Sequence, residues 1–414
     1  MIAAKLPLIV GRWNFGPITT QHRRRGTVCL VLGDVRSMGA GMACFREVSK
    51  GQNGRRDVEC CSSGKGGVDV VNAGVVGGRV SPEHLVVMVN GIIGSATDWK
   101  FAAEQFVEML PKTVIVHRSE CNSATLTFDG VDLMGERLAE EVLGVVRRWP
   151  GLQKISFVAH SLGGLVARYS IGRLYESVKE KNSWSEENSS HQMQSVGGYC
   201  KATIAGLEPM NFITFATPHL GSRGNKQLPF LCGLPFLERQ ASQTAHLVAG
   251  RSGKHLFLTD NDYGRPPLLM RMVTDTDGLK FISALRSFKR RVVYANANYD
   301  HIVGWRTSSI RRQHELPKVN LLVSDSKYPH ILYIEVDTFE GGSHQPVSST
   351  QYQEVDFEEM MIRGLSQVPW VRVHVSFQKS KQRYVAHNTI QVNRYWLNSD
   401  GADVIFHMID NFVL

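Results

Sequence analysis

The feature that most constrains the fold is a serine between an apolar run and a helical pattern. The β-branched and aromatic run at 155–158 leads into Ala-His-Ser-Leu-Gly at 159–163, and helical spacing of apolar residues starts at once. A serine at such a sharp turn needs small residues two positions before and after it, so that strand and helix can approach. Ala159 and Gly163 meet this need. The stretch predicts a nucleophile elbow with Ser161 at its apex, against the alternative of a buried serine that caps a helix.

Backbone N–H groups near this serine are expected to form an oxyanion hole. A helix that begins directly behind Ser161 leaves unpaired N–H groups and a positive dipole end there, so Leu162 is one expected donor. A second donor is expected from the glycine-punctuated loop after the apolar run 84–89, where Ile92 follows Asn90 and Gly91. Asn90 is expected to line the substrate pocket. The alternative for this loop is a plain strand-to-helix turn.

Strand and helix patterns alternate along the chain. Apolar runs at 84–89, 114–117, 154–160 and 211–216 alternate with helical patterns at 99–110, at 130–149 and after Ser161. This rhythm predicts an α/β protein, specifically an α/β-hydrolase fold with a mostly parallel, doubly wound sheet and helices on both faces. Ligands of such sheets bind at the carboxyl edge, where residues that follow the strands meet.

The acid that would orient a catalytic histidine is expected in a loop after a strand. Asp300 lies one short loop after the apolar run 291–297. Asp262, Asp275 and Asp277 are poorer candidates, because all three precede that strand.

The general base is expected on a loop after the last strand, 370–377. His387 meets this expectation. His407 is the second candidate, although its place on a terminal helix at 401–412 is simpler to explain as the edge of the core. The chain order Ser161, Asp300, His387 is the order of an α/β-hydrolase.

Two insertions are expected within the domain. Residues 222–277 form a long excursion rich in apolar and aromatic side chains, Phe230 and Phe236 among them, which predicts a lid over an apolar substrate or an additional helical layer. His219, just before it, could line the acyl pocket or be structural. A second insertion is expected at about 313–369.

The first eighty residues show no sustained periodicity. We expect 1–80 to be a disordered or weakly ordered extension and 81–414 to be the hydrolase domain. Residues 1–41 hold several arginines and a single acid, Asp34, which is faintly similar to a plastid transit peptide; alternatively, Met42 is a natural start. Seven scattered cysteines favour a reducing compartment, so the expected location is cytoplasmic, peripheral at lipid surfaces. No run is long and apolar enough for a transmembrane segment.

The net charge of +9, from 47 Lys and Arg against 38 Asp and Glu, is too dispersed to indicate a nucleic-acid partner. The densest basic clusters lie at 286–291 and 306–312. A solvated face explains them better than contact with anionic lipid head groups does.

Five motifs together resemble the serine esterase family of lipase-like α/β-hydrolases found across eukaryotes, closest to its plant members. They are Val-Asn-Gly-Ile-Ile-Gly-Ser at 89–95, Phe-Val-Ala-His-Ser-Leu-Gly-Gly at 157–164, Phe-Ala-Thr-Pro-His-Leu-Gly at 215–221, Tyr-Asp-His-Ile-Val-Gly-Trp at 299–305 and Ala-His-Asn-Thr-Ile at 386–390. The resemblance covers about 82–412. It implies hydrolysis of lipid esters with Ser161 as nucleophile and His387 and Asp300 as its partners. Many lipase-like hydrolases have His-Gly where this chain has Asn90-Gly91, and a backbone donor survives that change.

The sequence therefore predicts a serine carboxylic-ester hydrolase that works through an acyl-enzyme, with no metal and no organic cofactor. The expected substrate is an acylglycerol, a phospholipid or a sterol ester, and peripheral contact with a membrane or lipid-droplet surface is an expected partnership. Two alternatives stay open: an acyltransferase with the same triad, and a non-catalytic lipid-binding scaffold.

Overall fold

The computed structural model describes residues 58–62, 68–72, 82–111, 113–177, 202–222, 249–261, 264–276, 278–319, 322–337 and 356–414. Within these residues one nine-stranded sheet has the order β1-β2-β4-β3-β5-β8-β9-β11-β10. The strands are β1 Val58–Ser62, β2 Val68–Asn72, β3 His84–Val89, β4 Val114–Arg118, β5 Lys154–His160, β8 Glu208–Phe215, β9 Arg290–Asn296, β10 Ile331–Val336 and β11 Val371–Val375. A separate ribbon pairs β6 Tyr175–Ser177 with β7 Ala202–Ile204.

The six central strands are parallel and the outer ones are not. β4, β3, β5, β8, β9 and β11 pair in parallel, whereas β1, β2 and β10 join at the edges in antiparallel pairs. Every residue of β3 is buried, as expected for a strand covered on both faces. The sheet therefore has the mostly parallel character of the α/β-hydrolase fold that the sequence predicts.

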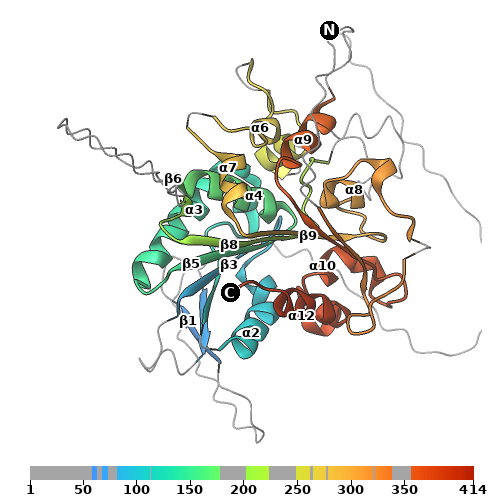
Figure 1. The fold of residues 1–414 in the computed structure, drawn as a ribbon, viewed down its shortest axis with the longest axis horizontal. Helices are drawn as coiled ribbons and strands as arrows, with labels where there is room; N and C mark the ends of the chain where they lie inside the picture. Colours follow the sequence, from blue (N-terminus) through green and yellow to red (C-terminus); the bar gives the residue numbers. More distant parts are fainter. Residues whose placement is uncertain are drawn as a thin grey trace, which may run out of the picture. The chain divides into compact units, whose positions relative to one another are not determined.

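Helices cover both faces of this sheet (Figure 1). One face carries α3 Val131–Arg148, α4 Leu162–Leu174, α6 Leu268–Arg271, α7 Phe281–Ser287 and α9 Phe357–Leu365. The other face carries α2 Lys100–Met109, α10 Ala386–Thr389 and α12 Ala402–Asp410. The shorter helices are α8 Trp305–Ser309 and α11 Tyr395–Asn398. Single turns of 3-10 helix lie at Ala96–Trp99, Ala124–Phe128, Gln313–Glu315, Arg383–Val385 and Ser399–Gly401.

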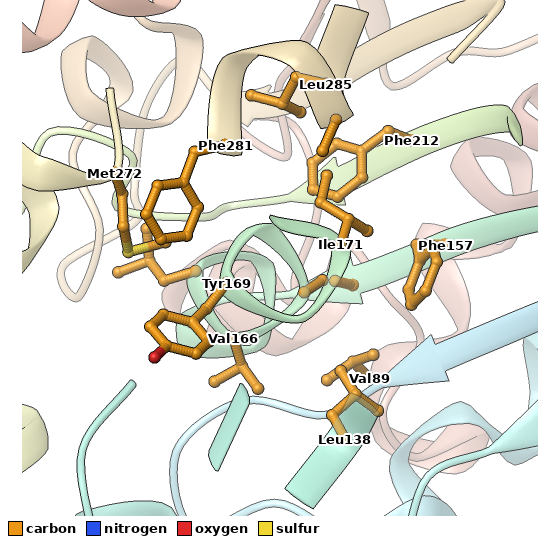
Figure 2. Packing of buried hydrophobic residues seen from close by; sticks show 14 of the residues in the cluster. Val89, Leu138, Phe157, Val166, Tyr169, Ile171, Phe212, Met272, Phe281 and Leu285 are labelled. Atoms are coloured by element: carbon orange, nitrogen blue, oxygen red, sulfur yellow. The ribbon is translucent and has the colours of Figure 1, made fainter. Parts of the chain in front are cut away.

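The helix behind the candidate nucleophile lies at the centre of one core. Figure 2 shows Val166 and Ile171 of α4 among Val89 and Phe157 of the sheet and Phe281 of α7. Twelve of the thirteen residues of α4 are buried, so this helix has almost no solvent face. Such burial fixes α4 against the sheet and with it the turn that holds Ser161.

Two sequence expectations differ from the structure. The ordered part was expected to begin near residue 81, but β1 and β2 precede it and extend the sheet through β4. Both strands are five residues long, too short to give a sustained period. The sequence also predicts an insertion at about 313–369, which the structure describes only in part. Within its described residues, β10 pairs with β11 as an edge strand and α9 packs into the core, so part of it belongs to the fold.

The proposed lid at 222–277 is described only in part. Residues 223–248, including Phe230 and Phe236, lie outside the described residues. Within the rest, Leu268 and Leu269 of α6 are buried in the same core as α4. That portion is therefore a packed layer. None of the helices in the described part of the chain combines the length and the apolar character that crossing a bilayer requires.

Candidate active site

Ser161 stands at a strained turn between β5 and α4. Its backbone has φ 54° and ψ −131°, a conformation that L-residues rarely adopt. Its N–H donates to the carbonyl of Phe215 at 2.9 Å, which ties the turn to the end of the neighbouring strand β8. A Cβ added to Gly163 would lie 2.4 Å from the carbonyl oxygen of Asn90. The close approach of α4 to the end of β3 therefore requires glycine at 163, as the elbow motif predicts.

The structure brings the side chains of Ser161, His387 and Asp300 into one line. His387 Nε2 lies 3.1 Å from Ser161 Oγ, and His387 Nδ1 lies 3.0 Å from Asp300 Oδ2. The serine follows β5, the acid lies in the loop after β9, and the histidine is on α10, beyond β11. All three strands are parallel, so these residues meet at one carboxyl edge although 226 positions separate the serine from the histidine.

Asp300 has a buried side-chain carboxylate with several hydrogen-bond donors. Its Oδ1 accepts the N–H groups of Ile302 at 3.0 Å and Val303 at 2.9 Å, and its Oδ2 accepts the amide of Asn296 at 2.9 Å. Burial alone would raise the pKa of Asp300, but the nearby His387 ring and these hydrogen bonds outweigh it, so the pKa lies below its usual value. The carboxylate is therefore charged at neutral pH and able to fix an imidazole tautomer.

Two buried polar side chains hold the backbone of the histidine, and sequence reasoning missed both. His160 Nε2 lies 2.7 Å from the carbonyl oxygen of His387, and the amide of Asn296 donates to that of Ala386 at 3.3 Å. Burial lowers the pKa of His160 to about 3, so its ring is neutral and donates one N–H. The available signal was their place at the ends of β5 and β9, the strands that lead to the serine and the acid.

The two expected oxyanion donors lie beside the serine. A Cβ on Gly91 would be 2.8 Å from Ser161 Cβ, so the loop that carries Ile92 touches the elbow. Among the described residues, the backbone N–H groups of Ile92 and Leu162 form no hydrogen bond. Both are therefore free to donate to a ligand, which is what an oxyanion hole requires.

Asn90 and His219, the other predicted site residues that the structure describes, make hydrogen bonds within the protein. The amide of Asn90 donates to the carbonyl of Asn122 at 3.0 Å and so holds the loop that contains Ile92. His219 is completely buried, with its Nε2 2.9 Å from Thr214 Oγ1 and its ring against Trp370. These contacts lie in the protein interior, so a role of His219 in the acyl pocket stays a prediction.

His407, the second candidate for the base, lies elsewhere. Its Nδ1 is 2.8 Å from the hydroxyl oxygen of Tyr294, and its ring packs on Tyr328. Burial lowers the pKa of His407 to about 4. His407 therefore lies on the buried face of α12, as its helical spacing indicates.

Two fungal proteins with sequences similar to this chain are both named as putative lipases. The chain is 32% identical to "Putative lipase ROG1" of Saccharomyces cerevisiae over 233 residues, which are 55% of this chain and 28% of that protein. It is 28% identical to "Putative lipase C4A8.10" of Schizosaccharomyces pombe, over 55% of this chain and 26% of that protein. The chain thus spans little more than a quarter of the length of these relatives.

A solved structure and a family model extend the comparison. Carboxyl esterase 2 of Tuber melanosporum matches with 10% identity and a TM-score of 0.39, covering 85% of this chain and 89% of that one, a similarity too low to carry an argument. The family model described as "Putative serine esterase (DUF676)" matches residues 79–310, more than half of the 414 residues, and includes Ser161 and Asp300. The chain belongs to this serine esterase family.

Proposed function

We propose that the protein is a serine carboxylic-ester hydrolase with Ser161 as nucleophile, His387 as general base and Asp300 as the acid that orients it. The observation that carries the proposal is the unbroken line from Ser161 Oγ through both ring nitrogens of His387 to the buried carboxylate of Asp300, at 3.1 Å and 3.0 Å. A neutral imidazole that donates Nδ1–H to Asp300 leaves Nε2 free to accept the serine proton.

The reaction has two halves. Ser161 Oγ attacks the acyl carbonyl while its proton moves to His387 Nε2, and the N–H groups of Ile92 and Leu162 stabilise the oxyanion. The imidazolium then protonates the leaving alkoxide, the ester bond breaks, and the acyl group stays on the serine. In the second half water attacks this acyl-enzyme while His387 takes its proton. The imidazolium then returns that proton to Ser161 Oγ as the acyl bond to the serine breaks and the carboxylic acid leaves.

The proposed substrate is a lipid ester: an acylglycerol, a phospholipid or a sterol ester. The relatives named as lipases support this choice, as does the apolar composition of residues 222–258. Acyl transfer is a second candidate, because an alcohol that reaches the acyl-enzyme before water would give an ester product from the same residues.

Fluorophosphonate labelling tests the nucleophile. The wild-type protein should react at Ser161, and Ser161→Ala should abolish labelling. Ser170→Ala is the matched control, because Ser170 is a buried serine of the same helix outside the proposed site. A wild-type protein that does not label would favour the non-catalytic lipid-binding scaffold.

A panel of lipid classes, each assayed with and without an alcohol acceptor, tests the reaction. A free fatty acid as the product in both conditions supports hydrolysis. A new ester that forms only with the alcohol would favour the transferase.

We also propose a reducing compartment, with cytoplasmic location and peripheral contact with lipid surfaces. Cys121 is a free thiol, and burial raises its pKa well above the usual value, so it is unreactive. Fractionation of tagged protein tests this location against the plastid, which residues 1–41 would favour if they act as a transit peptide. That this chain is most similar to plant members of the family stays a prediction, since the relatives reported above are fungal.

A further inference from the structure

We propose that residues 376–399 form a docking element for an anionic phospholipid membrane, which brings the mouth of the candidate site to the lipid surface. This proposal rests on the proposed function, because a membrane would supply the lipid substrate. Binding to a membrane does not itself require Ser161. The element starts where β11 ends, passes through α10 with His387, and continues through α11.

Large aromatic and aliphatic side chains of this element face solvent. Trp396 is 76% exposed, Tyr384 67% and Tyr395 57%, and Leu397 is exposed as well. The ring of Tyr395 stacks on Phe101, in the first turn of α2, with centroids 5.0 Å apart. Because α2 begins just after the loop that follows β3, this contact lies at the carboxyl edge of the sheet, as the triad does.

Neighbouring loops of the site add to the exposed apolar surface. Ile93 is 68% exposed and follows Ile92, the proposed oxyanion donor. Ile302 is also exposed and donates its backbone N–H to Asp300. Loops after β3, β9 and β11 therefore all carry outward apolar side chains around one edge. Exposed apolar groups gathered in this way mark an interaction surface.

The charge of the element identifies the partner. Residues 376–399 contain no Asp or Glu but four cationic residues, Lys379, Lys381, Arg383 and Arg394. Among the described residues none of the four forms an ion pair. Arg383 instead places its guanidinium over the rings of Tyr384 and Tyr299.

The basic cluster at 306–312 does not share this property. Arg306 pairs with Glu358, Arg311 with Glu335 and Asp337, and Arg312 with Glu315 and Glu359. These acids neutralise the cluster at 306–312, as expected of a solvated face.

The acids near this element make contacts of their own. Asp98 is partly buried, and its electrostatic interaction with Arg394 opposes the rise in pKa that burial causes, while Glu104 lies 4.0 Å from Lys100. Asp400 accepts the hydroxyl of Ser380, and Asp403 pairs with His330. Glu104 and Glu108 of α2 line one pocket with Arg394, Tyr395 and Trp396, whereas Lys379 and Lys381 do not line it.

Tryptophan and tyrosine favour the interface between lipid and water, where an apolar ring meets a polar group. Each lysine or arginine near an anionic bilayer raises the partition constant roughly fivefold at physiological salt. Cationic and aromatic residues on one short element therefore match a phospholipid surface that carries negative head groups. Exposed cations without an ion pair, such as Lys379 and Lys381, favour an anionic surface over a neutral protein groove.

Cosedimentation with vesicles tests the inference. The probes are vesicles of phosphatidylcholine alone and of phosphatidylcholine with phosphatidylglycerol. We expect the wild type to bind the anionic vesicles more tightly, and binding to weaken with added salt. The double variant Lys379→Glu with Lys381→Glu should lower the partition constant at least 25-fold, following the fivefold effect of each cation. Trp396→Ala should lower it on neutral and anionic vesicles alike.

The matched control is Arg147→Glu with Arg286→Glu. Both arginines are exposed and lie at helix ends just before β5 and β9, at the opposite edge of the sheet, so this variant makes the same change in net charge. It should bind within about twofold of the wild type, since exposed charges beyond a Debye length of roughly 8 Å are screened. Equal loss in both double variants would overturn the inference, because net charge alone would then explain binding.

Ser161→Ala separates this inference from the proposed function. It should bind vesicles as the wild type does while fluorophosphonate labelling is lost. Unaltered thermal unfolding of the lysine variant excludes a folding defect as the cause of weaker binding. Two further outcomes would overturn the inference: a wild type that ignores anionic vesicles, and a lipid-free dimer that Trp396→Ala dissociates, which would identify a second copy of the chain as the occupant.

Discussion

Asp300 supplies the buried negative charge of the candidate site. Two backbone N–H groups and one amide converge on its carboxylate, and the imidazole of His387 accounts for the remaining contact. The charge of this carboxylate, rather than its hydrogen-bonding capacity, would stabilise the imidazolium that forms during reaction.

Asp300→Asn should therefore keep the geometry but lower kcat by roughly 10³- to 10⁴-fold, because the amide favours the wrong imidazole tautomer. Steady-state kinetics on a monomeric ester measure the change. Asp403→Asn is the control, since Asp403 also accepts a hydrogen bond from a histidine, His330 at 2.9 Å, but away from the site. A loss of activity below tenfold in Asp300→Asn would contradict the assigned role.

His160 is expected to position His387 through its backbone. Replacing it with phenylalanine removes the N–H that reaches the His387 carbonyl, so kcat should fall roughly 10- to 100-fold while KM changes little. His160→Gln keeps a donor and should recover part of kcat. His84→Gln is the matched control, because His84 is also a buried, neutral strand histidine, bonded to Ser156 at 2.8 Å. Wild-type kcat in His160→Phe would exclude a positioning role.

At the scale of elements, the packing of α4 against β3 determines whether the elbow forms. Gly163→Ala would place a methyl 2.4 Å from the Asn90 oxygen and 2.7 Å from the Val89 oxygen, both backbone atoms that cannot easily move. We expect a loss of about 1–3 kcal/mol in unfolding free energy.

Gly144→Ala is the comparison variant, and we expect it to change the unfolding free energy in the opposite direction. Gly144 lies within α3, and an added Cβ there would meet nothing closer than 4.0 Å. That change should stabilise the protein by about 0.5–1 kcal/mol through helix propensity. Urea unfolding of both variants measures the difference, and equal effects would show that the contact at residue 163 relaxes without cost.

The sequence predicts the buried strands but not the side-chain contacts around the site, for physical reasons. Buried parallel strands are continuous apolar runs, so β3, β5, β8 and β9 were predictable, and with them the edge at which Ser161, Asp300 and His387 meet. The roles of His160 and Asn296 depend on which carbonyl each side chain reaches, and no periodicity records this. Likewise, composition cannot distinguish the exposed Trp396 from Trp370, which is 1% exposed.

At the scale of the whole molecule, a buried charge cluster connects the amino-terminal hairpin to the main sheet. His117 of β4 has its Nδ1 2.5 Å from Asp69 of β2 and its Nε2 3.4 Å from Glu141 of α3. Arg148 and Trp149 also donate to Asp69. Burial alone would lower the pKa of His117, but the two carboxylates outweigh it and raise the pKa above the usual 6.5.

Stability should therefore depend on pH in a defined direction. Protonated His117 stabilises the fold fully below about pH 6.5, its unfolded pKa, and this contribution is lost as pH rises through the higher folded pKa. The lowered pKa of Asp69 adds a second contribution, which is present above about pH 4 and lost as pH falls through the folded value.

Urea unfolding between pH 5 and pH 9 tests this dependence. The wild type should lose stability as pH rises, and His117→Gln should lack that part of the slope. His84→Gln serves as the control, because burial lowers the pKa of His84 to about 3 and it does not titrate in this range. An identical slope in wild type and His117→Gln would rule out His117 as the titrating group.

The order of strands along the chain also determines the order in which the residues of the proposed site are synthesised. The elbow serine leaves the ribosome 226 residues before His387, which arrives only after β11 has been made. Since folding during synthesis proceeds from the amino-terminal side, a nascent chain can hold a formed elbow with no base beside it. Such a chain could not begin the proposed ester cleavage before the segment that carries His387 has been made and has folded.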